Sequence, residues 1–338
     1  MNQISHKISI AMCTYNGAKY LQEQLESIAR QTCQPHELII CDDGSIDSTT
    51  EIIEAFKKDC DFKVKIYRNG KNLGSTKNFE QAILLCEGDI IFLADQDDVW
   101  RADKIKKVVA LFLKSPNLNL VFTDAIMVDE HLSSLGTTIW ESTNFKRRKV
   151  KQFIKGNALK ILVNQYVVTG ATMAFRSYLK DIIVPIHKEW IHDGWIAIFA
   201  AATGDVGLIN EPLIFYRRHS SQQVGIPVKK SKVRQIMGSE NPLKSEYQPF
   251  VSNNDHLCLV LKRFIELNKI GKLTDDIILR FKSEMLQVNE KINYMYERSH
   301  LPKKKFKRLP IILSNLAANR YHRFSNGFLT AIKDLLHT

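Results

Sequence analysis

The stretch DIIFLADQDD, residues 89–98, joins an apolar run of strand length to three carboxylates within four residues. The run from Asp89 to Ala94 is short and rich in β-branched and aromatic residues, which is typical of a buried strand. Like charges gathered at the end of such a strand repel one another, so a cation has to compensate them. The stretch therefore predicts an interior strand with a charged site at its carboxyl end.

Four more apolar runs have strand length, and they lie at Ile8–Met12, Glu37–Cys41, Phe62–Tyr67 and Leu118–Thr123. Segments with helical spacing stand between the runs, at Tyr20–Arg30, Ser48–Lys58, Ser75–Cys86 and Asp103–Lys114. This alternation favours an α/β fold with a doubly wound, mostly parallel sheet. Ligands of such sheets bind beyond the carboxyl ends of the strands.

Polar motifs follow two other predicted strands, Thr14-Tyr15-Asn16-Gly17 after the first and Asp42-Asp43-Gly44-Ser45 after the second. Taken alone, each motif is equally consistent with a plain turn, and Asp98 alone with a helix cap. Together with the Asp95-Gln96-Asp97 triplet, a DXD motif, they favour a ligand site. Mg²⁺ or Mn²⁺ binds carboxylates and substrate phosphates, so we expect a divalent metal and a nucleoside diphosphate.

The chain continues with a predicted helix at Val150–Val163, a strand-like segment at Gly170–Arg176, and a helix opened by His192-Asp193-Gly194-Trp195. We expect the α/β unit to close near Val224. The predicted domains are therefore 1–226, with a nucleotide-binding part of about 7–124 and an acceptor part of about 125–226, and a basic helical region at 227–338. Helical patterns in that region cover Asp255–Leu267 and Asp275–Tyr296.

The net charge of +12 belongs mainly to this second region, because residues 229–338 hold 21 Lys and Arg against 10 Asp and Glu. A basic run, Lys303 to Arg308, is flanked by apolar Leu309–Leu313 and Phe328–Leu336. It is either a solvated face or a contact with an anionic membrane surface. No zinc-finger, helix-turn-helix or aromatic-basic motif accompanies the charge, so nucleic acid is not an expected partner.

Location is predicted from the N-terminus and the cysteines. Residues 1–6 lack a charged start followed by an apolar stretch, so export is not expected. The six cysteines are scattered, which indicates a reducing compartment and no metal cluster. We expect a cytoplasmic protein, either free or peripheral on the inner face of the cell membrane.

Read together with Asn72-Leu73-Gly74, the strand-end motifs resemble family 2 glycosyltransferases over about residues 7–220. The segments His192 to Trp195 and Glu211 to His219 are similar to the rhamnosyltransferase-like branch of that family. The resemblance implies a GT-A fold and an inverting, metal-dependent transferase of the hexosyltransferase type. It would use a nucleoside-diphosphate sugar, with dTDP-rhamnose as the expected donor. The acceptor would be a saccharide or a lipid-linked saccharide in bacterial surface polysaccharide synthesis.

The resemblance also assigns a donor side. Thr14, Tyr15, Asn16 and Asp43 would surround the pyrimidine base, with Asn72 nearby, and Asp95 would contact the ribose or the donor sugar. Asp97 would bind the metal, and His219 would contact the metal or the diphosphate. Arg217 or Arg218 would contact the diphosphate.

On the acceptor side, Asp193 matches the catalytic base of the family, although an acidic residue at a helix start is equally a cap. Trp190 and Trp195 would supply surfaces on which sugars stack. Gly194 departs from the pattern, because relatives of the branch often carry a bulky aromatic there, and this affects the fit of donor or acceptor. His187 and His192 lack the spacing of a metal pair.

Two alternatives to a glycosyltransferase are a sugar-nucleotide-binding protein without activity and a nucleotidyltransferase. A nucleotidyltransferase would carry a Gly-rich basic loop after the first strand.

Overall fold

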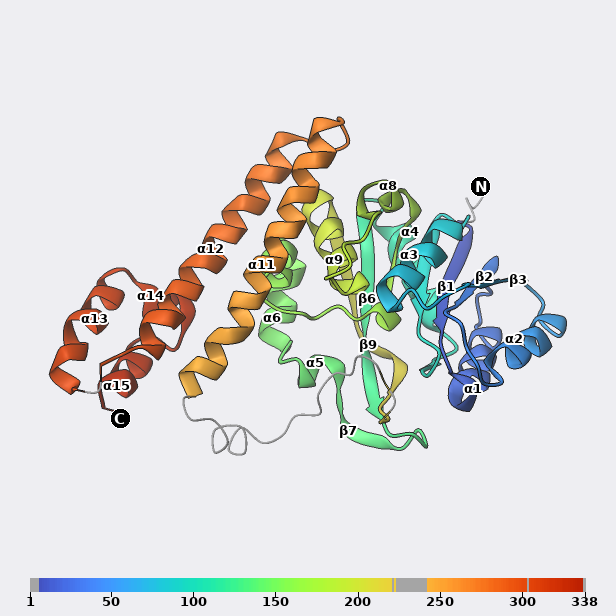
Figure 1. The fold of residues 1–338 in the computed structure, drawn as a ribbon, viewed down its shortest axis with the longest axis horizontal. Coiled ribbons are helices and arrows are strands. Elements are labelled where there is room, and N and C mark those ends of the chain that lie inside the picture. The colour runs from blue at the N-terminus through green and yellow to red at the C-terminus, as the bar shows by residue number, and fades with distance from the viewer. Residues whose placement is uncertain (1–5, 221, 223–241, 303, 337–338) are drawn as a thin grey trace. The chain divides into compact units, whose positions relative to one another are not determined.

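The computed structural model describes residues 6–220, 222, 242–302 and 304–336. The chain forms two compact units, Met1–Val228 and Lys229–Thr338 (Figure 1). The predicted closure near Val224 and the predicted boundary after residue 226 lie outside the described residues.

The first unit is built on one mixed sheet, which has nine strands among the described residues and the order β3-β2-β1-β4-β8-β6-β9-β5, with β7 paired to β6. Strands β1 to β4 run parallel to one another, whereas β8 runs antiparallel to β4 and β6. The strands are β1 Ile8–Thr14, β2 Glu37–Asp42, β3 Lys63–Arg68, β4 Ile90–Ala94, β5 Val99–Trp100, β6 Leu118–Val128, β7 Ser134–Thr138, β8 Met173–Arg176 and β9 Asp205–Arg217. The five predicted strands are confirmed.

Helices connect and cover these strands (Figure 1). They are α1 Ala18–Ala29, α2 Thr49–Lys58, α3 Ser75–Leu85, α4 Lys104–Lys114, α5 Ile139–Ser142, α6 Arg147–Gln152, η1 Phe153–Asn157, α7 Ala158–Leu162, η2 Gly170–Thr172, η3 Ser177–Leu179, α8 Lys180–Ile183 and α9 His192–Thr203. The four predicted connecting helices are confirmed. The helix predicted at Val150–Val163 is broken, because Gly156 has a φ of 89°. Only Met173–Arg176 of the strand-like segment is a strand.

The core of this unit explains why the strand ends meet. β1, β2 and β4 are buried nearly throughout, as their continuous apolar runs require. Their register places Thr14 opposite Asp42 and Met12 opposite Ala94. The motifs that follow these three strands are thereby brought to the same edge of the sheet.

The second unit is helical and contains α11 Pro242–Lys269, α12 Asp275–Ser299, α13 Lys305–Ala317, α14 Arg320–Phe324 and α15 Phe328–Leu336. α11 packs against α12, with Phe264 against Phe281. The helices that follow close over a small cluster formed by Tyr294, Met295, Ile312, Tyr321 and Ala331. Within the described part of the chain, no helix is both long and apolar enough to span a bilayer.

A buried ion pair ties α12 to α15 in this second unit. Arg298 Nε and Nη2 donate to the two carboxylate oxygens of Asp334 at 2.6 and 2.9 Å. The Tyr321 hydroxyl donates to the same carboxylate at 2.8 Å. The carboxylate thus joins three helices through charged and neutral hydrogen bonds.

We predict that Asp334→Ala lowers the free energy of unfolding of the second unit by about 3–5 kcal/mol, because it leaves the buried Arg298 cation without its partner. Arg323→Ala removes the exposed pair between Arg323 and Glu290 and should cost at most about 1 kcal/mol. Urea unfolding followed by far-ultraviolet circular dichroism measures both variants.

All four tryptophans belong to the first unit, so their fluorescence follows that unit separately. Equal midpoints for the two variants, or a loss of stability seen in tryptophan fluorescence alone, would contradict the structural role of Asp334.

Candidate functional site

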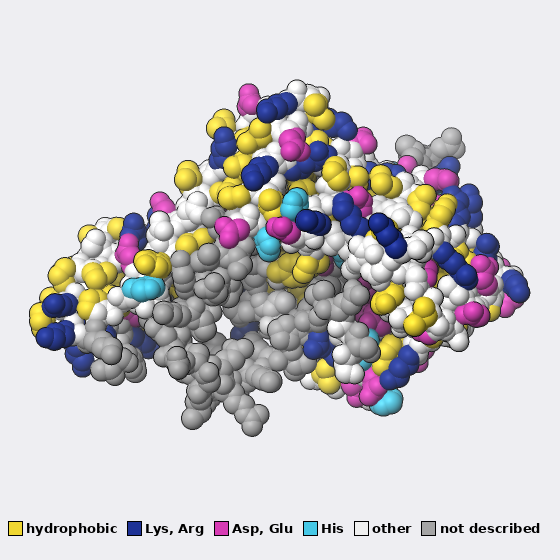
Figure 2. Space-filling model, viewed as in Figure 1, with side chains coloured by type: hydrophobic (Ala, Val, Ile, Leu, Met, Phe, Trp, Pro, Cys, Tyr) yellow, Lys and Arg dark blue, Asp and Glu magenta, His cyan; other side chains and the backbone are white. Residues whose placement is uncertain are grey.

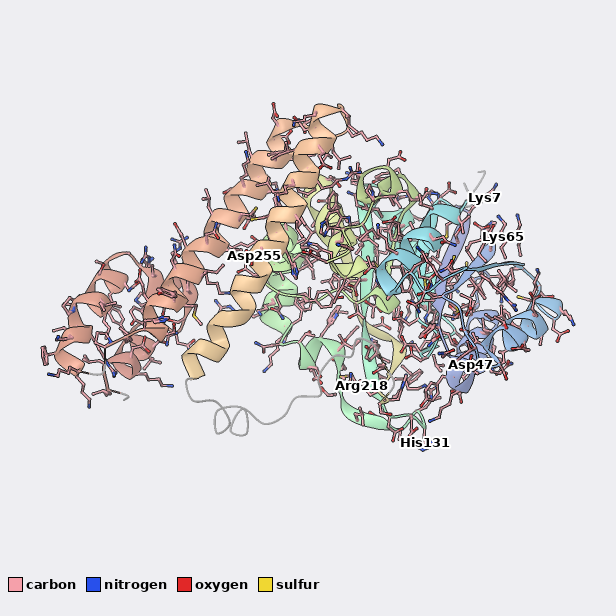
Figure 3. The ribbon with its side chains drawn as sticks, in the orientation of Figure 1. Lys7, Asp47, Lys65, His131, Arg218 and Asp255 are labelled. Carbon is pink, nitrogen blue, oxygen red and sulfur yellow. The ribbon has the colours of Figure 1, made fainter. Side chains whose placement is uncertain are left out.

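The loop after β1 is fastened to the loop after β2. Thr14 Oγ1 donates to Asp42 Oδ2 at 2.7 Å, and the backbone N–H of Asn16 donates to Ser45 Oγ at 2.8 Å. Asn16 has a φ of 48°, and its side-chain oxygen accepts from the N–H of Ile46. Ala18 N donates to Asp47, which Figure 3 labels beside these loops. Tyr15 stays 41% exposed on this fixed loop, so its ring is available to a ligand.

Gln96, which stands out in the sequence only by its place in the DXD triplet, links this loop to the end of β4. Its side-chain oxygen accepts from Tyr15 N at 2.8 Å, and its amide nitrogen donates to Tyr15 O at 3.1 Å. A Cβ atom at position 17 would lie 2.2 Å from that oxygen, so the link requires Gly17. The first and third strand-end motifs are therefore one structural unit.

Asp43 is buried and organises the segment Asn69 to Gly74. Its carboxylate accepts hydrogen bonds from Asn69 Nδ2 and Leu73 N, both at 2.8 Å, and from Gly74 N at 2.9 Å. Asn72 Nδ2 lies 3.4 Å from the carbonyl oxygen of Asp43. The predicted donor-side residues Asp43 and Asn72 are thus adjacent, with the Asp43 carboxylate already engaged by its own chain.

The three aspartates after β4 have different surroundings. Burial, with Asp97 and Asp193 as negative neighbours, raises the pKa of Asp95 to about 7. Burial and the charges of Asp97 and Asp95 also hold the pKa of Asp98 well above its usual value. Asp98 precedes β5 and its Oδ1 accepts from Arg217 N at 3.0 Å, so it does not cap a helix.

Lys104, at the start of α4, partly compensates these carboxylates and was missed by sequence reasoning. It is fully buried, its Nζ donates to Ala171 O at 2.7 Å, and it lies 3.4 Å from the ring centre of Trp100. Burial lowers its pKa, while Asp98 and Asp95 act against that change. The position of this lysine shortly after an acidic cluster could have indicated its role, but lysine also occurs at helix starts for other reasons.

Arg217, at the end of β9, is buried and its guanidinium is engaged by the protein. Its Nε donates to Asp97 O at 2.7 Å, its Nη1 donates to Glu130 O at 2.5 Å, and its Nη2 pairs with Glu23. The geometry therefore does not support the expected contact of Arg217 with a diphosphate. Arg218, partly exposed just beyond β9 (Figure 3), keeps that predicted role.

Asp97 and His219 meet although they are far apart in the sequence. His219 Nε2 lies 2.8 Å from Asp97 Oδ2, and the imidazole packs on the Tyr20 ring with 4.6 Å between ring centres. Among the residues that the structure describes, no group of three or more His, Cys, Asp or Glu side chains could hold a metal by itself. The pair suits a metal that takes its other ligands from phosphates and water, as Mg²⁺ commonly does.

Asp193 lies in the first turn of α9, and Ile191, not Asp193, is the N-cap residue. Its Oδ2 accepts from Gly170 N at 2.9 Å and its Oδ1 from Gly194 N at 2.7 Å. The Tyr166 hydroxyl also hydrogen-bonds to Asp193. The carboxylate is thus fixed on the same side of the molecule as Asp95, whose pKa it raises.

The predicted sugar-stacking tryptophans are largely buried. Trp195 is 1% exposed and its Nε1 donates to Ile183 O at 2.7 Å, so the expected stacking surface is not supported there. Trp190 packs edge-on against Trp195 and is 9% exposed. Tyr166 is 41% exposed and is the accessible ring beside Asp193, but no motif surrounds it in the sequence.

Gly194 faces these rings. A Cβ atom at position 194 would lie 3.1 Å from Tyr166 Cε2 and 3.3 Å from Trp190 Cζ3. A bulky aromatic side chain would need this same space, which gives a physical reason for the departure at Gly194. His192 is buried against Phe79, with 4.0 Å between ring centres, while His187 Nδ1 accepts from Glu189 N.

The model of the family described as "Glycosyl transferase family 2" matches residues 9–183, which is 175 of the 338 residues. The chain belongs to glycosyl transferase family 2. The predicted resemblance is thereby confirmed.

Curated relatives of this family member include an uncharacterised glycosyltransferase of Nostoc, which is 26% identical over 64% of the chain and 66% of the relative. The dTDP-rhamnosyl transferase RfbG of Shigella flexneri is 27% identical over 67% of the chain and 78% of the relative. The putative glycosyltransferase EpsE of Bacillus subtilis is 31% identical, but over 37% of the chain. The chain thus spans from 45% to 78% of the length of these three relatives.

Solved structures with the same fold include S. aureus TarS 1–349, with a TM-score of 0.56 and 17% identity over 92% of this chain and 79% of the other. TarS 1–349 in complex with UDP-GlcNAc aligns with a TM-score of 0.53 and 18% identity, over 83% and 73% of the two chains. These similarities confirm the predicted GT-A fold.

The raised pKa of Asp95 predicts a pH dependence of stability. Between about pH 4 and pH 7 the folded protein keeps a proton on Asp95 that the unfolded chain has released, so this group lowers the free energy of unfolding as the pH rises. Asp95→Asn removes the effect. The stability gained by the variant should grow from about pH 4 to pH 7 and then level off.

Urea unfolding of both proteins at a series of pH values gives this difference. Asp205→Asn, at an exposed aspartate that begins β9, is the matched control and should show no such trend. A difference between Asp95→Asn and wild type that stays constant with pH would contradict the raised pKa.

Proposed function

We propose that this chain is an inverting glycosyltransferase that moves a sugar from a nucleoside diphosphate to a saccharide acceptor. The observation that carries the proposal is the electrostatic proximity of Asp97, Asp95 and Asp193, since both of the other carboxylates raise the pKa of Asp95. A donor-side motif and an acceptor-side carboxylate thus lie near one another, as a single displacement requires. Family membership is consistent with this chemistry.

On the donor side, we propose a pyrimidine nucleoside diphosphate. The exposed Tyr15 ring and the fixed loop from Thr14 to Asn16 suit an aromatic base, with Asp43 and Asn72 forming the neighbouring wall. The TarS structures, one with UDP-GlcNAc and one with UDP, support a donor of this class. RfbG is named a dTDP-rhamnosyl transferase, which makes dTDP-rhamnose the first donor to test.

In the reaction, Asp193 accepts the proton of the attacking acceptor hydroxyl. The acceptor oxygen forms a bond to the anomeric carbon while the bond from that carbon to the diphosphate oxygen breaks, so the configuration inverts. The N–H groups of Gly170 and Gly194 orient the Asp193 carboxylate, and Asp95 holds the ribose or the donor sugar. The half-exposed Tyr166 ring, rather than Trp195, lies where an acceptor sugar could stack.

A divalent cation fits the pair formed by Asp97 and His219, because their Oδ2 and Nε2 atoms converge at 2.8 Å. We propose Mn²⁺ or Mg²⁺, with Asp97 as its principal ligand. When bound, the ion would supply charge stabilisation for the departing diphosphate. The buried carboxylates nearby favour a cation at this position.

The cellular role we propose is the addition of one sugar to a bacterial surface polysaccharide or its lipid-linked precursor, at the cytoplasmic side of the membrane. A sugar-nucleotide-binding protein without activity is the remaining alternative, and the Asp193 carboxylate, fixed by Gly170 N beside the partly exposed Tyr166 ring, argues against it. A nucleotidyltransferase is disfavoured by the Thr14 to Gly17 loop, which carries no Lys or Arg.

We predict that Asp193→Asn lowers the rate of sugar transfer at least about 100-fold, because the amide cannot accept the proton. The amide oxygen can still accept from Gly170 N, so the affinity for the donor should stay within about twofold. The rate is measured as release of nucleoside diphosphate from dTDP-rhamnose or UDP-GlcNAc with an envelope extract as the source of acceptor. Asp205→Asn is the matched control. Near-wild-type turnover by Asp193→Asn would remove Asp193 as the base.

We predict that Asp97→Ala weakens binding of UDP or dTDP at least about tenfold in the presence of Mn²⁺, because the charge-assisted contact to the metal is lost. In EDTA, the variant and the wild type should bind alike. Isothermal titration calorimetry measures the nucleotide affinity of the variant and of the wild type, each in Mn²⁺ and in EDTA. Equal loss of affinity with and without Mn²⁺ would show that Asp97 acts on the nucleotide itself and would contradict the metal assignment.

A further inference from the structure

The last helix of the chain has its polar side chains turned inward. On α15 the buried side chains are Thr330, Ala331 and Asp334. Its exposed side chains include Phe328, Leu329, Ile332 and Leu336, which are between 53% and 69% exposed. An amphipathic helix that packs on its own protein normally does the opposite and buries its apolar face.

Helix α13, which packs against α15, shows the same inversion. It buries Arg308 and Asn315 beside Ile312. Phe306, Leu309 and Leu313, spaced three and four residues apart on one side of the helix, are between 45% and 71% exposed. The basic run, predicted from sequence as either a solvated face or a membrane contact, is divided, since Arg308 is buried while its neighbours are exposed.

Hydrogen bonds fix both helices in this rotation. Arg308 Nη1 donates to the carbonyl oxygen of Asp334 at 2.9 Å, and Asp334 holds Arg298 and Tyr321 with its carboxylate. Asn315 Nδ2 donates to Glu297 at 2.7 Å. Turning either helix to hide its apolar side chains would break these buried bonds and strand charged groups. The exposed apolar rows are thus a stable feature of the folded unit.

Basic residues surround these rows, and the charge is one-sided. Residues 301–336 contain eight Lys and Arg against one acidic residue, Asp334, which is buried. Lys304, Lys305, Lys307 and Lys333 are exposed. Figure 2 shows hydrophobic and basic side chains side by side where Figure 1 draws α13 and α15.

We propose that the apolar rows of α13 and α15 and these four lysines, here called the apolar–basic surface, bind an anionic membrane leaflet. Apolar side chains would enter the acyl boundary while lysines contact lipid headgroups, as in interfacial helices. A second copy is disfavoured because two strongly positive faces would repel, and nucleic acid offers no partner for Phe328 or Leu329.

The test is co-sedimentation of the full chain with vesicles of phosphatidylcholine, with or without phosphatidylglycerol. Wild type should bind the anionic vesicles and leave the neutral ones largely unbound. Binding should weaken as salt is added, because the electrostatic part is screened. Absence of binding to vesicles of either composition would overturn the proposal.

Variants locate the contact. Leu329→Glu with Ile332→Glu should lower vesicle affinity at least about tenfold, because two apolar side chains can no longer be buried in lipid. The matched control is Leu279→Glu with Leu286→Glu on α12, at leucines that are 64% and 65% exposed, and it should bind as wild type does.

Lys304→Gln with Lys305→Gln should lower the affinity for anionic vesicles about fivefold for each lysine. Unchanged far-ultraviolet circular dichroism shows that each variant is folded.

Two results would overturn the membrane assignment even for well-folded variants. One is equal vesicle binding by the α15 variant and the α12 control, which would place the contact elsewhere. The other is a wild-type dimer in light scattering that Leu329→Glu with Ile332→Glu converts to a monomer, without vesicle binding by either protein, which would make a second copy the occupant of the surface.

Discussion

Repulsion among Asp95, Asp97 and Asp98 at the buried end of β4 is the interaction on which the candidate site depends. Burial together with this repulsion raises the pKa of Asp95 and Asp98, and the fold buries the Lys104 and Arg217 side chains beside them. Both side chains donate to backbone carbonyl oxygens, Lys104 to that of Ala171 and Arg217 to that of Asp97. The remaining negative charge is what suits the cluster to a cation-bound diphosphate.

The parallel strands were predictable because a buried strand leaves a short, continuous apolar run in the sequence. The same rule did not reveal β5, which has two residues, or β9, whose run is interrupted at Glu211 and Pro212. It also did not reveal the break at Gly156, because a glycine within a helical pattern gives no sign of a left-handed φ. The local pattern of apolar residues therefore predicted the central parallel strands but not β5 or β9.

The candidate site was likewise predictable only in part. Residues at strand ends were placed correctly beside one another because parallel strands share one edge, as Thr14 and Asp42 show. The direction of a side chain depends on partners that are far away in the sequence. The inward direction of Arg217, which pairs with Glu23, and of Trp195, which donates to Ile183 O, was therefore not predictable. In the second unit, the spacing predicted helices, but only the Arg298–Asp334 pair shows which face of α15 is inward.

We propose that a metal-bound nucleoside diphosphate occupies the edge formed by the ends of β1, β2 and β4. Anomalous scattering from crystals soaked with Mn²⁺ and UDP or dTDP locates the metal without assuming a role for any residue. We expect one manganese peak within bonding distance of Asp97, with the base near Tyr15. A nucleotide ordered elsewhere, or a manganese peak remote from Asp97, would contradict it.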